Sequence, residues 1–165
     1  MKKYLLGEDN KEFGGKISSE DIIYSCYLIE VISRIIMQRN KYTVNKMGLK
    51  NITNLIYFSK DYRVMAPEES AEELIKDLKL EEGNFIISDI PPQYFIGIPD
   101  EWRMGQKYGE LVLDTKTEDE TFAEAIIRVY NNPICDIIDD YSCNAFQEPR
   151  DNTKIAYDLG YFDFQ

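Results

Sequence analysis

The chain has 165 residues, 44% of them hydrophobic, which is enough to build one folded domain around its own core. It contains no histidine, and this excludes Ser-His-Asp and Cys-His catalytic centres as well as zinc sites built on imidazole. Residues 1–66 carry 11 Lys and Arg against 7 Asp and Glu, whereas residues 67–165 carry 8 against 23. This asymmetry favours a protein that meets other macromolecules through its surface.

No apolar run in the chain approaches the roughly 18 residues that a membrane-spanning helix needs. The N-terminal stretch stops being apolar after Leu5 and Leu6, which argues against a signal peptide. We therefore expect a cytoplasmic protein that does not associate with a membrane. Cys26, Cys135 and Cys143 form no Cys-x-x-Cys pair, so we expect free thiols, no metal and no other cofactor.

Helical spacing dominates the first part of the chain. A serine followed by two acids within residues 18–21 predicts a helix start, and apolar residues then recur every three or four positions to about Gln38. A short helix over residues 43–47 is expected to end at Gly48 in a left-handed cap. A third helix follows over residues 52–58.

The rest of the chain reads as helices interrupted by one irregular stretch. Pro67 is expected in the first turn of a helix that reaches about residue 78. Residues 83–99 contain prolines and glycines that predict an ordered loop, in which residues 85–87 allow one short strand pair. Helical spacing returns over residues 100–113 and 117–130. Pro133 interrupts it, and it resumes over residues 134–138.

These patterns predict a mainly α, compact, multi-helix single domain over residues 1–165. Residues 1–17 are expected to form an N-terminal arm, and residues 144–165 an acidic and aromatic C-terminal tail. No internal repeat, low-complexity tract or flexible linker divides the sequence.

Three carboxylates follow one another at helical spacing near the end of the last predicted helix. Asp136, Asp139 and Asp140 would share one helix face and offer oxygen ligands to a hard cation such as Mg²⁺. Acids on an exposed helix face are far more often simply solvated, so we expect no metal site. A carboxylate-dependent metal enzyme is kept as a third hypothesis.

A basic segment over residues 34–63 holds seven Lys and Arg interleaved with tyrosines. Such a patch can bind phosphates, and the contacts we single out for nucleic acid are Arg39, Lys41, Lys46 and Lys50. A solvated basic edge, or one that pairs with the acidic half of the same fold, is the more common meaning of such a cluster. Nucleic-acid binding is therefore the second hypothesis.

The acidic and aromatic C-terminal region is the best candidate for function, because its rings can anchor in a partner while its acids attract a basic surface. The alternative is that these rings fold back onto the helical core. The residues that we predict to contact a partner are Asp136, Asp139, Asp140, Tyr141, Phe146 and Trp102.

Several short stretches resemble a group of small bacterial proteins of no established activity, encoded on mobile elements beside toxin–antitoxin-type genes. The resemblance lies within residues 18–145 and rests on residues 21–24, 27–30, 44–48, 71–75, 98–99, 129–131 and 138–141, with Trp102, Gly105 and Tyr108. It implies a similar genomic setting rather than a mechanism.

Together these observations predict a non-enzymatic protein-interaction module. We expect an antitoxin-like or regulatory component of a bacterial toxin–antitoxin or defence system, whose acidic C-terminal half covers a basic surface on a protein partner. The sequence leaves the identity of the partner and the oligomeric state open.

Overall fold

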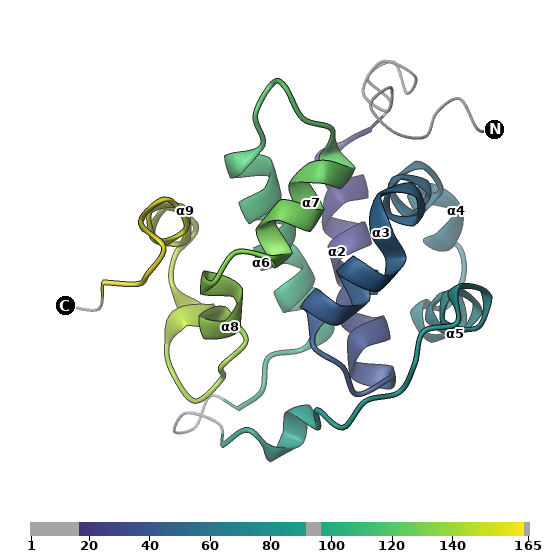
Figure 1. Ribbon diagram of the computed structural model, residues 1–165, viewed down its shortest axis with the longest axis horizontal. Coiled ribbons are helices and arrows are strands. Elements are labelled where there is room, and N and C mark those ends of the chain that lie inside the picture. The colour runs from purple at the N-terminus through teal and green to yellow at the C-terminus, as the bar shows by residue number, and fades with distance from the viewer. Residues whose placement is uncertain (1–16, 92–96, 164–165) are drawn as a thin grey trace.

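The computed structural model describes residues 17–91 and 97–163 of the chain. Within these ranges the chain forms eight α-helices, two 3₁₀ segments and no strand (Figure 1), which confirms the mainly α prediction. The helices are α2 (Ser19–Ile35), α3 (Asn40–Tyr57), α4 (Ser59–Tyr62), α5 (Pro67–Leu78), α6 (Glu101–Thr115), α7 (Phe122–Tyr130), α8 (Ile134–Ile138) and α9 (Arg150–Leu159), and the 3₁₀ segments are η2 (Ile87–Asp89) and η3 (Ala145–Gln147). The predicted arm, residues 1–17, lies outside the described residues except for Ile17.

Helix α2 is the central element of the core and packs against α3, α5 and α6. Ser18 caps its N-terminus: the Ser18 hydroxyl accepts from the Asp21 amide, and the Asp21 carboxylate accepts from the Ser18 amide at 2.8 Å. This reciprocal capping satisfies two amides that a helix start otherwise leaves unpaired, and it confirms the predicted start. The helix ends at Ile35, before the predicted Gln38.

Two glycines let α6 lie directly against the backbone of α2. A Cβ atom at Gly105 would stand 2.5 Å from the Cα of Tyr27, and one at Gly109 would stand 2.8 Å from the Cα of Ile23. Both distances are shorter than a carbon–carbon contact permits, so larger residues would push the two helices apart. The glycine spacing of four residues places both positions on the same face of α6.

Several predicted boundaries are confirmed by local backbone geometry. Gly48 has φ of 75° and breaks the helical path inside α3, although its ψ of 174° is not that of the predicted left-handed cap and α3 continues beyond it. Pro67 opens α5, where its missing N–H costs no helical hydrogen bond. Pro133 directly precedes α8 and separates it from α7.

Two segments differ from the sequence prediction. Residues 85–87 form no strand pair, because the Phe85 amide donates to the Met37 carbonyl at 2.9 Å, just beyond the end of α2, and η2 follows. The predicted C-terminal tail, residues 144–165, instead contains η3 and the helix α9. Figure 1 shows α9 at one edge of the molecule, far from α4 and α5.

Candidate functional site

Helix α9 leaves a row of large apolar side chains uncovered. Thr153 and Ala156 are its buried residues, and α6 is the helix that it packs against. On its outer side Ile155, Leu159 and Tyr161 keep 55%, 51% and 54% of their surface exposed. Because Ile155 and Leu159 are four residues apart on one helix face, they form a continuous apolar strip with Tyr161 beyond the helix end.

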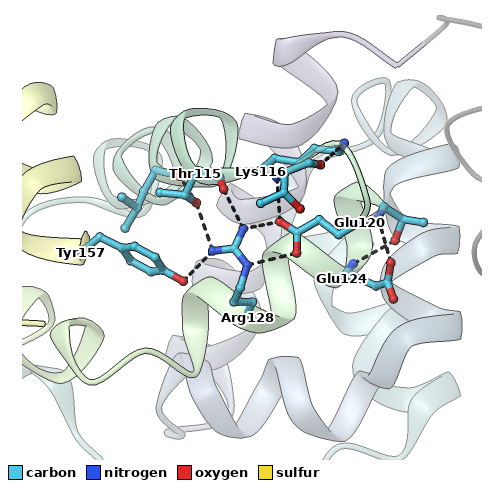
Figure 2. Close-up of polar contacts among 9 residues, drawn as sticks. Thr115, Lys116, Glu120, Glu124, Arg128 and Tyr157 are labelled. Carbon is cyan, nitrogen blue, oxygen red and sulfur yellow. Dashed lines mark hydrogen bonds and ion pairs between the residues drawn. The ribbon is translucent and has the colours of Figure 1, made fainter. Parts of the chain in front are cut away.

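Arg128 fastens α9 to the rest of the fold (Figure 2). Its Nη1 donates to the Tyr157 hydroxyl of α9 at 2.5 Å and to the Thr115 hydroxyl at 3.3 Å. Its Nη2 donates to the Thr115 carbonyl and to Glu120, and its Nε donates to Glu120 at 3.1 Å. All five N–H donors of the guanidinium are therefore used. We call these four residues, Arg128, Glu120, Thr115 and Tyr157, the Arg128 clasp.

Hydrogen bonds from Arg128 also lower the pKa of Glu120, and the geometry explains this, since a bidentate guanidinium favours the ionised carboxylate. The Arg128 guanidinium lies over the Tyr157 ring as well, 5.5 Å from its centroid. The clasp thus joins the end of α6, the loop before α7, α7 itself and α9. Its role is to mount α9 in one orientation.

Two further side chains tie α9 to α6. Arg150 donates to both carboxylate oxygens of Asp114, at 2.8 and 2.7 Å. Lys107 donates to the Glu148 carbonyl at 2.7 Å and to the Thr153 hydroxyl at 2.9 Å, and burial lowers the pKa of Lys107 to about 8. These contacts pair both basic groups with oxygen atoms of the same chain.

The outer side of α9 is consequently acidic as well as apolar. Lys154, the other basic residue of the helix, pairs with Asp158 at 2.5 Å. Asp151 stands four residues before Ile155 on the same face, and it is exposed. A hollow of about 130 Å³ beside the apolar strip is lined by Glu148 and Asp163 together with the strip residues Ile155, Leu159 and Tyr161. We call this area, Ile155, Leu159 and Tyr161 with Glu148, Asp151, Asp158 and Asp163, the α9 surface.

Two of the six predicted partner contacts are core residues instead. Tyr141 is 1% exposed and Phe146 is 2% exposed, and their rings meet edge to face with centroids 5.3 Å apart. Both rings are therefore covered in this fold, and contact of either with a partner stays a prediction. The reason is that η3 folds back and buries both rings against the helical core, which is the alternative that the sequence left open.

The three predicted carboxylates, Asp136, Asp139 and Asp140, do lie together, on one shallow hollow that Arg39 and Lys41 also line. Asp136 and Asp140 are exposed, and Asp140 accepts from the Ser142 amide at 3.1 Å. Nearby basic side chains make this hollow less acidic than the sequence suggests. Among residues 17–91 and 97–163, no three Cys, Asp or Glu side chains are placed to hold a metal ion.

Asp139 belongs to a line of hydrogen-bonded side chains inside the core, which we call the buried polar chain: Arg34, Glu30, Asn40, Asp139 and Tyr108. Arg34 Nε and Asn40 Nδ2 both donate to Glu30, each at 2.9 Å. Asn40 Nδ2 also faces Asp139 at 3.3 Å, and the Tyr108 hydroxyl donates to Asp139 at 2.6 Å. The line crosses from α2 through the start of α3 to the end of α8 and to α6.

Burial raises the pKa of both carboxylates in this chain. Glu30 is 2% exposed, and its pKa is raised despite the opposing charge of Arg34. Burial, and then the negative charge of Glu30, raise the pKa of Asp139 to about 8. Asp139 therefore holds a proton for much of the time at neutral pH, because two carboxylates sharing one amide cannot both ionise cheaply.

The inner end of this pair, at Glu30, has no room for a substrate. The hollow against Glu30, Arg34 and Asn40 measures about 10 Å³, which is space for one water at most. The arrangement can take up and release a proton, and it fixes how four helices meet. The buried polar chain is thus internal at Glu30 and reaches a surface hollow at Asp139.

The residues predicted for nucleic-acid binding are exposed but do not line one recognition helix. Arg39 precedes α3 and lies over the Phe85 ring, 4.3 Å from its centroid. Lys46 and Lys50 stand on opposite sides of the break at Gly48. Elsewhere in the basic segment, Arg34 pairs with Glu30, and Arg63 pairs with Asp21 at 2.6 Å. Part of the positive charge is thus neutralised by acids of the same half of the chain, and Arg34 also reaches Glu101 of the acidic half at 3.4 Å.

Trp102, the sixth predicted contact, lies at the surface in the first turn of α6 with 48% of its area exposed. Its ring touches Tyr27 of α2, with centroids 5.3 Å apart. It is thus accessible to a partner, although contact with one stays a prediction.

The sequence analysis singled out the acidic and aromatic C-terminal region but not the apolar strip of Ile155 and Leu159, and it did not identify the buried polar chain. A signal existed for each: Ile155 and Leu159 repeat at helical spacing within a polar stretch, and Glu30 and Arg34 interrupt the apolar pattern of α2 four residues apart. No helix among the described residues is long and apolar enough to cross a bilayer.

Comparison with protein-family models, with curated proteins and with solved structures finds no match to this chain. A function for this protein is therefore inferred from the geometry of its own residues.

Proposed function

We propose that this protein acts by binding a protein partner that carries a basic surface. In this proposal it is an antitoxin-like or regulatory component of a bacterial toxin–antitoxin or defence system. The single observation that carries the binding proposal is the exposed apolar strip on α9, set in acidic surroundings and mounted on a firmly fixed helix.

The strip supports association because burying Ile155, Leu159 and Tyr161 against a partner releases apolar surface from water. The acids of the α9 surface would add direction: they attract Lys and Arg on the partner and disfavour acidic proteins. The Arg128 clasp contributes preorganisation, since a helix already held in place loses little conformational freedom on binding.

The proposed mechanism is occlusion, in which the α9 surface covers a basic functional cleft on the partner. This moves the contact from the region around Asp139, Asp140 and Tyr141 to α9, because Tyr141 is buried and Asp139 is engaged inside the fold. The toxin–antitoxin setting is supported by the resemblance of the short sequence stretches, and it belongs to the proposal.

The test is affinity capture from cells of the native host, followed by calorimetry with the captured partner. Replacing Ile155→Asp and Leu159→Asp together should weaken binding by at least about tenfold, since each buried aliphatic side chain contributes roughly 1.5–3 kcal/mol. Val64→Asp is the matched control, because Val64 is exposed and lies outside α9. Equal affinity of the double variant and the control would contradict the proposal.

Nucleic-acid binding through Arg39, Lys41, Lys46 and Lys50 is the second candidate, and the exposure of these four side chains supports it. A mobility-shift titration at increasing salt separates the two candidates. Phosphate contacts would give an affinity that falls steeply with salt, whereas occlusion of a protein partner requires no nucleic-acid binding.

A further inference from the structure

Three aromatic side chains form a ladder across the contact of α2 and α6. Tyr24 and Tyr27 meet edge to face with centroids 5.4 Å apart, and Tyr27 meets Trp102 in the same way at 5.3 Å. The exposure of the rings increases along the ladder: Tyr24 is buried, Tyr27 is half-buried and Trp102 is exposed. We call these three residues the aromatic ladder.

The inner end of the ladder already carries a cation. Arg63 lies over the Tyr24 ring with its guanidinium carbon 5.9 Å from the centroid, while its nitrogens pair with Glu20 and Asp21. An aromatic face and carboxylates thus hold one guanidinium together at this end.

In the described part of the chain, a Lys or Arg side chain lies over an aromatic ring at six places. The rings are those of Tyr141, Phe85, Tyr24, Phe146, Phe122 and Tyr157. Within that part, no Lys or Arg of the chain itself lies over Trp102. Yet the indole is the ring that attracts cations most strongly. The outer end of the ladder therefore offers the strongest such face in the protein to an outside group.

Acidic residues lie next to Trp102 in the sequence and near its neighbour Tyr27. Asp100 and Glu101 directly precede Trp102, and the charges of Glu68, Glu101 and Asp100 act on Tyr27 from nearby. Glu101 is partly used by Arg34, whose Nη1 lies 3.4 Å from its carboxylate. Asp100 and Glu68 are exposed, so their charge faces solvent.

We propose that Trp102 and its sequence neighbour Asp100 form a binding site for an arginine side chain of the protein partner. The indole face would stack on the planar guanidinium, and the Asp100 carboxylate would supply the opposite charge, as Glu20 and Asp21 do for Arg63 at the inner end. The inference rests on the proposed function in that the ligand belongs to a protein partner, but the site is separate from the α9 surface.

The chain contains one tryptophan, so its fluorescence reports on this site alone. The probe is a hexa-arginine peptide, titrated in low salt, with a hexa-citrulline peptide as the uncharged control of the same shape. We expect the arginine peptide to shift Trp102 emission in a saturable way and the citrulline peptide to leave it unchanged. An equal response to both peptides, or no response to arginine, would overturn the proposal.

Substitutions give the second measurement, using the anisotropy of a labelled arginine peptide. Trp102→Leu should weaken binding about two- to fivefold, the range expected for one exposed cation–π contact. Tyr57→Leu is the control, because Tyr57 is an exposed ring outside the ladder. Unchanged affinity in Trp102→Leu, or an equal loss in the control, would refute the site.

Asp100→Asn tests the role of charge without disturbing the helix. Asp100 caps α6 by accepting from the Arg103 amide at 2.7 Å, and asparagine caps helices equally well. The variant should bind arginine about twofold more weakly and with less dependence on salt; full wild-type affinity at every salt concentration would contradict the proposed role of Asp100.

The α9 double variant separates this inference from the proposed function. If the Ile155→Asp, Leu159→Asp variant still binds the partner and Trp102 emission responds to the arginine peptide, partner binding through the α9 surface is refuted. The arginine site then stands. If that variant loses the partner while wild-type Trp102 ignores arginine, the function stands and the arginine site is wrong.

Discussion

The buried polar chain and the Arg128 clasp use the same types of side chain and treat charge in opposite ways. In the core, burial raises the pKa of Glu30 and of Asp139 although Arg34 and Asn40 contact Glu30. At the edge, Glu120 receives two bonds from Arg128, and its pKa is lowered. The difference shows that desolvation, and not the presence of an arginine alone, decides the state of a carboxylate in this protein.

The two regions also serve different ends. The buried polar chain links helices that are already held by apolar packing. It fixes their relative orientation, but taking its charged groups out of water costs free energy. The Arg128 clasp holds a helix that has few buried residues of its own, namely Thr153 and Ala156. Polar contacts thus orient the helices around the buried polar chain, whereas those of the Arg128 clasp attach α9 to the rest of the fold.

The largest expected effect follows from removing the central arginine. Arg34→Ala should lower the free energy of unfolding by about 3–5 kcal/mol, because Glu30 would remain buried without its cation. Chemical denaturation measures the loss. Combining the change with Glu30→Gln should recover part of it, since the unpaired charge is then gone. A double variant as unstable as the single one would show that packing, and not charge, explains the effect.

At the edge, Arg128→Met should cost about 2 kcal/mol, because its bonds to Glu120, Thr115 and Tyr157 are lost in a partly exposed setting. Hydrogen exchange should become faster in α9 before it does in α2. Arg128→Lys is the matched control: it keeps the charge but cannot reproduce five donors, so it should recover less than half of the loss. Uniform exchange across the molecule would argue against a local clasp.

Varying the pH distinguishes Asp139 of the buried polar chain from Lys107, which ties α9 to α6. Asp139 has its folded pKa raised to about 8, above its value in the unfolded chain, so the folded state binds more protons and the free energy of unfolding falls as pH rises from about 5 to 9. Lys107, with its pKa lowered to about 8, acts in the opposite sense above that pH.

Asp139→Asn isolates the contribution of the carboxylate. Relative to wild type, the variant should gain about 1–2 kcal/mol between pH 6 and pH 9, measured by denaturation at both values. Asp136→Asn, at an exposed neighbour, should show no such gain. A gain of the same size in both variants would mean that general surface charge, and not burial, sets the pH dependence.

The smallest effect concerns one hydroxyl of the clasp. Tyr157→Phe removes the acceptor for Arg128 Nη1 but keeps the ring under the guanidinium, so the loss should be about 1 kcal/mol. Thermal denaturation is sensitive enough to detect it. A loss as large as that of Arg128→Met would show that the clasp depends on Tyr157 alone.

Local physics explains what the sequence predicted well. Ser18 with Asp21, Gly48, Pro67 and Pro133 each act on backbone groups within four residues, so their effects do not depend on the rest of the fold. The helix α9 was missed because its few apolar residues are exposed and give no core-facing pattern. The site predicted around Asp139 and the α9 surface proposed here both lie in the C-terminal half, and binding at either stays a prediction.

The sequence by itself determined a helical chain without histidine, with its helix starts and breaks and with an acidic second half. Only the tertiary structure decided which polar and aromatic residues are inside. Asn40 and Asp139 meet although they are 99 positions apart, and Tyr141 is buried while Trp102 is exposed. The physical reason is that apolar periodicity marks which face of a helix is buried but not which distant segment covers it.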